Sequence, residues 1–175
     1  MRLLRAPRVV LAVGCAVAVV AGAVVAADRS ASAMRTAATA FLASLTPEQR
    51  ASATFDFDSA ERSRWNFIPP QAFPRNGLTF RAMTEPQREK AHALLKTGLS
   101  QRGYMTAASI MELENTLGGL ERAARGAGLN AETFPREPLE YYVSVFGTPS
   151  EKGPWGWRVE GHHVSLRFTV VNGSV

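Results

Sequence analysis

The sequence predicts an α+β domain in which amino-terminal helices pack on an antiparallel β-meander, preceded by a signal segment. Apolar residues recur with a helical period between about residues 34 and 126. From about residue 140 to 171 the pattern changes to runs rich in β-branched and aromatic residues, separated by turn-forming Gly, Pro and Ser. Helices followed by strands, rather than alternating with them, are typical of the α+β class.

The chain opens with a segment that resembles an export signal. Three arginines within residues 1–8 precede residues 9–27, which carry no charge, and small residues at 25–27 fit a cleavage site. We therefore assign residues 1–27 to a signal peptide and residues 28–175 to a single α+β domain. Residues 9–27 are also long enough for an uncleaved membrane anchor. Both alternatives place the domain outside the cytoplasm, because the arginines stay inside.

Helix-start signals divide the amino-terminal part. A helix is predicted over residues 34–45, and a second over residues 47–53, where Thr46 and Gln49 form a capping box. An extended piece follows at residues 55–58, and a proline-rich loop at 68–78. A second capping signal at residues 84–87 predicts a helix to residue 96. The last helix begins after Ser100 and runs past Leu120, with a break or close packing expected at Gly118 and Gly119.

Three strands are predicted after residue 126, at residues 141–146, 155–160 and 163–171. Residues 147–153 connect the first two, and Gly161-His162 forms a tight connection between the last two. Asn172-Gly173 is a further hairpin signal, yet only Ser174 and Val175 follow it. This pattern predicts that the chain is the amino-terminal part of a longer domain.

Three stretches carry a resemblance to a known family. They are residues 41–50 (FLASLTPEQR), 65–69 (WNFIP) and 153–166 (GPWGWRVEGHHVSL). The chain resembles, from about residue 34 to its end, the mostly bacterial family catalogued as domain of unknown function 3500. Members of that family are typically about twice as long, so the resemblance implies an amino-terminal half. It implies no activity.

Charge and cysteine content exclude several classes of protein. The formal net charge is +5, but without the three arginines of residues 1–27 it is +2, from 17 basic and 15 acidic residues. Nucleic-acid binding is therefore not expected. The only cysteine, Cys15, lies in the signal segment. The exported domain then has no disulfide, thiolate metal site or cysteine nucleophile.

The histidine pair suggests a metal site. Glu160, His162 and His163 lie close together in sequence, and neutral imidazole is a common ligand of divalent transition metals. Neighbours on a regular strand point to opposite faces, so chelation requires a bend at Gly161. The alternative is that one histidine packs inside and the other meets solvent.

The tryptophans suggest a different site. Trp65, Trp155 and Trp157 lie in turn-rich surroundings, and the last two share a strand face. They are candidates for lining a sugar or lipid groove, with coverage of the sheet as the alternative. Two classes of function follow. The first is an exported binding or scaffold domain with a protein or small-molecule partner. The second is an extracytoplasmic metal-assisted hydrolase that uses Glu160, His162 and His163.

Overall fold

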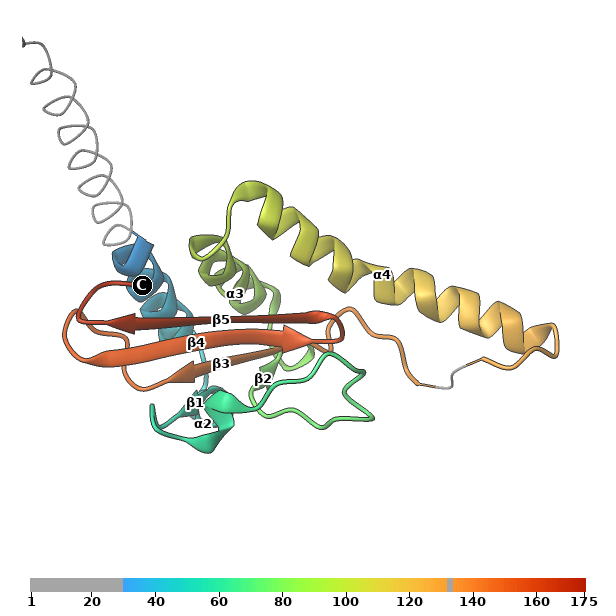
Figure 1. Ribbon diagram of the computed structural model, residues 1–175, viewed down its shortest axis with the longest axis horizontal. Helices are drawn as coiled ribbons and strands as arrows, with labels where there is room; N and C mark the ends of the chain where they lie inside the picture. The colour runs from blue at the N-terminus through green and yellow to red at the C-terminus, as the bar shows by residue number, and fades with distance from the viewer. Residues whose placement is uncertain (1–29, 132–133) are drawn as a thin grey trace, which may run out of the picture.

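The protein is described by a computed structural model that covers residues 30–131 and 134–175. The predicted signal segment, residues 1–27, lies outside the described residues. Residues 30–43 are helical, and the later elements are α2 (Pro47–Ala53), β1 (Thr54–Phe55), β2 (Leu78–Thr79), α3 (Glu85–Thr97), α4 (Gln101–Gly126), β3 (Tyr142–Phe146), β4 (Pro154–Gly161) and β5 (Val164–Val171). Within this described part, no helix has both the length and the apolar content needed to cross a membrane. The predicted α+β class is confirmed (Figure 1).

The two capping boxes that the sequence predicts also hold two helix starts together. Thr46 begins α2 and Thr84 begins α3, each with a glutamine three residues later that accepts a hydrogen bond from the cap residue's N–H. Gln49 and Gln87 then bond to each other through their amides, at 2.8 and 3.1 Å. The Gln87 amide also donates to Ser44 O at 2.8 Å. The similar motifs are therefore contact partners as well as local helix signals.

The predicted meander forms, with β3, β4 and β5 antiparallel in that order. The sheet is mixed, however, because β1 pairs with β3 in parallel and β2 pairs with β3 antiparallel. The parallel pair is two residues long, too short for a periodic signal in the sequence. Phe55 and Phe146 stabilise it, with ring centroids 5.4 Å apart, and Gly147 N–H donates to Phe55 O at 2.8 Å.

The hairpin between β4 and β5 turns one residue later than predicted. Gly161 is still part of β4 and pairs with Val164, so that His162 and His163 form the connection. A β-carbon on Gly161 would lie 2.4 Å from the Tyr141 ring, so only glycine fits beside that ring. The Asn172-Gly173 turn is confirmed, since both residues have positive φ and Val171 bridges to Ser174.

The two faces of the sheet are covered differently. One face carries Trp155, Trp157 and Val159 into the hydrophobic core, against residues 30–43, α3 and the first half of α4. The opposite face carries Ser144, Arg158 and Glu160, all buried. Residues 56–77, here named the covering segment, lie over this second face. The strand period of two explains the division, because alternate residues of β4 point to opposite sides.

α4 is continuous, so the predicted break at its glycines is wrong and the alternative of close packing is confirmed for Gly118. A β-carbon on Gly118 would lie 2.9 Å from the side chain of Arg136, whereas one on Gly119 would meet open space. The helix buries a stripe that includes Met111, Glu114 and Glu121. Two carboxylates therefore lie on its inner side.

Candidate functional site

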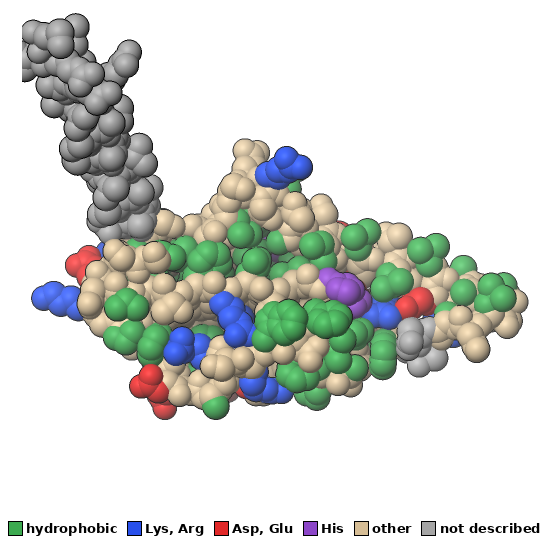
Figure 2. All heavy atoms as spheres, viewed as in Figure 1, with side chains coloured by type: hydrophobic (Ala, Val, Ile, Leu, Met, Phe, Trp, Pro, Cys, Tyr) green, Lys and Arg blue, Asp and Glu red, His purple; other side chains and the backbone are tan. Residues whose placement is uncertain are grey.

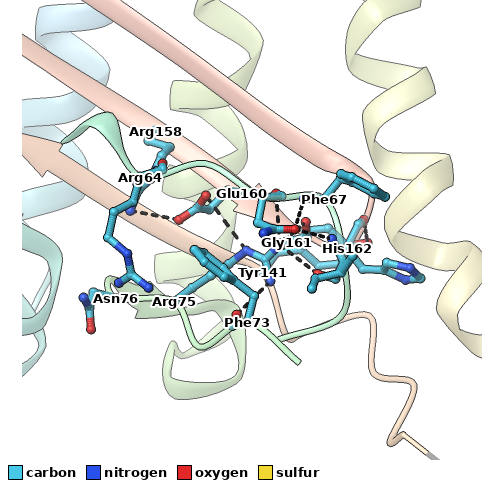
Figure 3. Close-up of polar contacts among 12 residues, drawn as sticks. Arg64, Phe67, Phe73, Arg75, Asn76, Tyr141, Arg158, Glu160, Gly161 and His162 are labelled. Carbon is cyan, nitrogen blue, oxygen red and sulfur yellow. Dashed lines mark hydrogen bonds and ion pairs between the residues drawn. The ribbon is translucent and has the colours of Figure 1, made fainter. Parts of the chain in front are cut away.

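A buried chain of ion pairs joins the sheet to the covering segment. Arg158 on β4 is fully buried, and one of its terminal nitrogens, Nη2, lies 2.8 Å from Glu160 Oε1 and 2.8 Å from Glu61 Oε1. The other Glu61 oxygen lies 3.1 Å from Arg64 Nη1 and accepts a hydrogen bond from Asn76 at 2.7 Å. Figure 3 labels Arg64, Asn76, Arg158 and Glu160 from this group.

A second buried arginine extends this network. The Nε atom of Arg75 lies 3.9 Å from Glu160 Oε2. Its Nη2 atom donates to the carbonyl oxygens of Asn66 (3.1 Å), Ile68 (2.8 Å) and Gly161 (3.1 Å). One guanidinium group therefore joins the covering segment to the end of β4. The other terminal nitrogen, Nη1, donates to Phe73 O at 3.3 Å, a bond for which lysine has no second nitrogen.

The arginines fix most of the backbone of the covering segment near its middle. Arg158 Nη1 donates to Glu61 O (2.8 Å) and Arg64 O (3.1 Å). Arg167 on β5 donates to Arg62 O at 3.2 Å and also to Arg64 O. Arg75 donates to the carbonyl oxygens of Asn66 and Ile68, and the His163 N–H donates to Phe67 O at 2.9 Å. All these bonds together engage the carbonyl oxygens of residues 61, 62, 64, 66, 67 and 68. The segment is irregular, yet its backbone is held by hydrogen bonds from the sheet, from the hairpin turn and from its own Arg75.

Burial and pairing shift the pKa values of the two glutamates in opposite directions. Burial raises the pKa of Glu160, although Arg158 and Arg75 oppose the shift. Burial also acts to raise the pKa of Glu61, but hydrogen bonds from Arg158, Asn76 and Arg64 outweigh it, so this pKa is lowered. Ionisation of Glu160 therefore lowers the stability of the folded protein, whereas ionisation of Glu61 raises it.

The hairpin turn with both histidines is fixed from two sides. The covering segment binds it through Arg75 on Gly161 O and through Phe67 O on the His163 N–H. From the helical face, Tyr141 Oη donates to His162 O at 2.8 Å. The position of the two imidazoles therefore depends on both layers that cover the sheet.

The two histidines occupy different environments. His162 is buried, and its Nδ1 forms a 2.5 Å hydrogen bond with Glu114 Oε1 on α4. His163 is exposed and has φ +57°, an unfavourable conformation for a residue with a β-carbon. Burial lowers the pKa of His163, and neighbouring His162 adds to the shift, so the exposed imidazole is neutral near pH 7.

An exposed row of aromatic rings starts at this turn. Trp65 is 56% exposed and Phe67 51%, with ring centroids 5.9 Å apart, and Phe67 stacks on His163 at 6.1 Å. We name Trp65, Phe67 and His163 the aromatic platform. Figure 2 shows large hydrophobic side chains beside a histidine on the open face of the molecule, with basic side chains next to them.

The three tryptophans that the sequence suggests do not share a surface. Trp155 and Trp157 are 0% and 1% exposed and lie in the core on the helical face, where Trp157 stacks on Phe168 at 4.5 Å. Trp65 lies on the other side of the sheet. Its neighbour in space is Phe67, which the sequence analysis missed. In the structure, exposed Ser63, Trp65 and Phe67 alternate with less exposed residues, whereas the sequence shows only two aromatic residues two positions apart.

The structure separates the predicted metal ligands. Glu160 faces Arg158 and Arg75 beneath the covering segment, whereas His162 faces Glu114 and His163 faces solvent. The two imidazoles do approach each other, with ring centroids 4.1 Å apart. In residues 30–131 and 134–175, no group of three or more His, Cys, Asp or Glu side chains is placed to hold a metal ion. The sequence allows Glu112 or Glu114 of the long helix to supply a carboxylate to the histidines, and in the structure Glu114 pairs with His162, 48 residues away.

Fold and site together define an α+β domain in which an arginine-fixed irregular segment presents exposed aromatic residues. The described residues, 30–131 and 134–175, include most of the range over which a known family matches the sequence. The chain belongs to the family described as protein of unknown function (DUF3500), whose sequence model matches residues 27–175. No curated protein and no solved structure shows significant similarity to the chain.

The opposite pKa shifts predict opposite pH dependence for two matched variants. We expect Glu160→Gln to have its most favourable effect on the free energy of unfolding at neutral pH, because the amide cannot ionise. This advantage shrinks as pH falls from the raised folded pKa of Glu160 towards the unfolded value of about 4.3. Urea denaturation of both proteins between pH 4 and 8 measures it.

Glu61→Gln is the control for that experiment. The lowered pKa of Glu61 contributes stability above the unfolded value of about 4.3, and this is lost as pH falls through the folded pKa. The variant should therefore cost most at neutral pH. If Glu160→Gln shows the same trend as Glu61→Gln, pairing with arginine outweighs burial at Glu160 and the assignment is wrong.

Backbone strain at His163 predicts that glycine stabilises this turn. We expect His163→Gly to raise the free energy of unfolding by about 0.5–1 kcal/mol. Removing the β-carbon from a left-handed residue stabilises the folded state by roughly 1–2 kcal/mol. The greater entropy of glycine in the unfolded chain offsets about 0.4–1 kcal/mol of this gain. Gly153→Ala is the reverse control, since Gly153 has φ +82° and no atom within 4 Å of an added β-carbon. A loss of stability in His163→Gly would mean that the imidazole is retained for packing.

Proposed function

We propose that the chain is an exported binding domain and that its aromatic platform, Trp65, Phe67 and His163, contacts a carbohydrate ligand. The proposal retains the class of function that the sequence favours and moves the site from the three tryptophans to this surface.

One observation carries the proposal. Two large aromatic side chains remain more than half exposed on a segment whose carbonyl oxygens are fixed by buried arginines. Burying such a side chain fully is worth about 1.5–3 kcal/mol, which this fold forgoes twice within three residues. A flexible loop would let the rings fold back onto the surface, whereas this one holds them outward. Binding to a surface that is already ordered loses less conformational entropy.

The chemistry of the platform suits a sugar. The negative faces of aromatic rings attract the C–H groups of a saccharide's apolar face, and polar groups at the rim provide hydrogen bonds for hydroxyl groups. His163 supplies a neutral imidazole at one end of the row. Spacings of 5.9 and 6.1 Å between successive rings extend the surface beyond one sugar unit. An oligosaccharide therefore matches the platform better than a monosaccharide does.

The metal-assisted hydrolase is not carried into this proposal. Its carboxylate, Glu160, is buried between two arginines, and its pKa is raised by that burial. His163 alone among the three predicted ligands faces solvent.

Loss of the aromatic rings tests the function. We expect Trp65→Ala and Phe67→Ala each to weaken binding at least tenfold, or about 1.4 kcal/mol, because exposed aromatic anchors dominate such contacts. Affinity electrophoresis against soluble neutral and acidic polysaccharides measures the loss. Leu120→Ala is the matched control, since Leu120 is 64% exposed on α4, away from the platform. Absence of retardation by every polysaccharide, or equal retardation of all variants, would refute the proposal.

Export is the second part of the proposal, and residues 1–27 support it through their arginines and uncharged apolar run. Fractionation of the native host should recover the protein in the periplasm or medium. Amino-terminal sequencing should then find a start near Asp28 if the signal is cleaved. Recovery from the cytoplasm with Met1 intact would contradict it.

A further inference from the structure

Positive charge concentrates beneath and beside the aromatic platform. Four arginines meet at the covered face of the sheet, against two glutamates: Arg64, Arg75, Arg158 and Arg167, with Glu61 and Glu160. Both glutamates are already paired inside the cluster, since Glu61 contacts Arg158 and Arg64 and Glu160 contacts Arg158. The cluster therefore carries an excess of two positive charges.

The nearest aspartates of the covering segment lie at its other end. Asp56 lines a hollow with Arg50, Gly147 and Thr148. Asp58 follows Phe57, and a β-carbon added to Gly147 would lie 3.2 Å from the β-carbon of Phe57. Gly147 follows β3 at the end where that strand pairs with Gly156, five residues of β4 away from the hairpin turn. At about 3.3 Å per residue this places the aspartates roughly 16 Å from the His163 end of the platform, beyond the Debye length of about 8 Å at physiological salt, and about 7 Å along the sheet from the Arg158–Arg167 pair.

Arg167 is the exposed member of the cluster nearest to the platform. It donates to the carbonyl of Arg64, the residue before Trp65, so its guanidinium lies beside the start of the aromatic row. Within the described ranges no carboxylate lies within ion-pair distance of Arg167. Arg64 lies next to it, with its side chain 39% exposed. A guanidinium with free donors at a rim is well suited to a carboxylate.

We infer that the saccharide bound by the aromatic platform is anionic, a chain of uronate units whose carboxylates face Arg167 and Arg64 while their rings lie on Trp65 and Phe67. The inference rests on the proposed function and specifies its ligand. A neutral glycan would use the rings alone and leave the charge of Arg167 unmatched.

The decisive comparison keeps the polymer backbone constant. Polygalacturonate and its fully methyl-esterified form differ in the charge of the carboxylates, so the difference in binding isolates electrostatics. We expect the exported protein to bind the free acid at least tenfold more tightly at low salt, about 1.4 kcal/mol. The preference should shrink as sodium chloride is raised, because salt screens exposed charges.

Variants of Arg167 separate charge from its bonds to the covering segment. Arg167→Gln should reduce the preference for the acid over the ester severalfold. Arg167→Lys keeps the charge and loses the fork, so it should retain much of the preference. Arg81→Gln is the control for general charge, since Arg81 is 54% exposed and pairs with Glu137 and Glu140 elsewhere on the surface.

The outcomes distinguish the inference from the function it rests on. Equal affinity for acid and ester at low salt, with both lost in Trp65→Ala, overturns the anionic ligand and leaves a carbohydrate site. A preference that survives unchanged in Arg167→Gln overturns the assignment to that residue. Binding of neither polymer overturns the inference, and the carbohydrate proposal falls with it only when no other polysaccharide retards the protein. Binding of a single-stranded oligonucleotide in place of every polysaccharide overturns both.

Discussion

The structure depends on the burial of Arg158 between the sheet and the covering segment. A guanidinium group has five N–H donors, and Glu61 and Glu160 together accept too few of them. The covering segment has the opposite need, because irregular backbone leaves carbonyl oxygens without partners. Arg158 bonds through Nη1 to the carbonyls of Glu61 and Arg64, which uses donors that the two carboxylates leave over and gives these two carbonyls partners. Arg75 donates in the same way to the carbonyl oxygens of Asn66, Ile68 and Gly161. Order in residues 61–68 therefore comes from Arg158 and Arg167 of the sheet together with Arg75 of the covering segment itself.

Buried ion pairs contribute little to stability by themselves, since desolvation offsets most of their attraction. The raised pKa of Glu160 is a direct sign of that cost. Apolar residues of similar size at Arg158 and Glu160 would pack without it, yet they would leave the carbonyls of the covering segment unbonded. The gain from the charged pair is thus a defined path for the backbone, and this path is what holds Trp65 and Phe67 outward. Geometry, rather than stability, explains why charges occupy the inner face of β4.

The sequence was sufficient for the parts of the fold that depend on local chemistry. Thr46 and Gln49 predict α2 at its observed bounds, and the change of period predicts the order of helices and strands. It was insufficient wherever a contact over long separation decides. Alternation along β4 places Arg158 and Glu160 opposite the tryptophans, which ordinarily indicates a solvent face. That this face is covered follows from residues 56–77, whose lack of periodicity gives no hint of it. The same alternation favours Trp155 and Trp157 as core residues, the alternative that the structure supports.

The hairpin turn shows how the two layers combine into one site. His162 is fixed from the helical face through Glu114 and Tyr141, and His163 from the covering segment through Phe67. Neither imidazole is held by its own strand, so displacement of α4 or of the covering segment would move the turn. The strained φ of His163 persists because these contacts over-determine the turn. Glycine would satisfy the same backbone at lower cost, and asparagine tolerates it better than histidine does. A strained, exposed imidazole next to two exposed aromatic rings is the arrangement on which the proposed ligand contact rests.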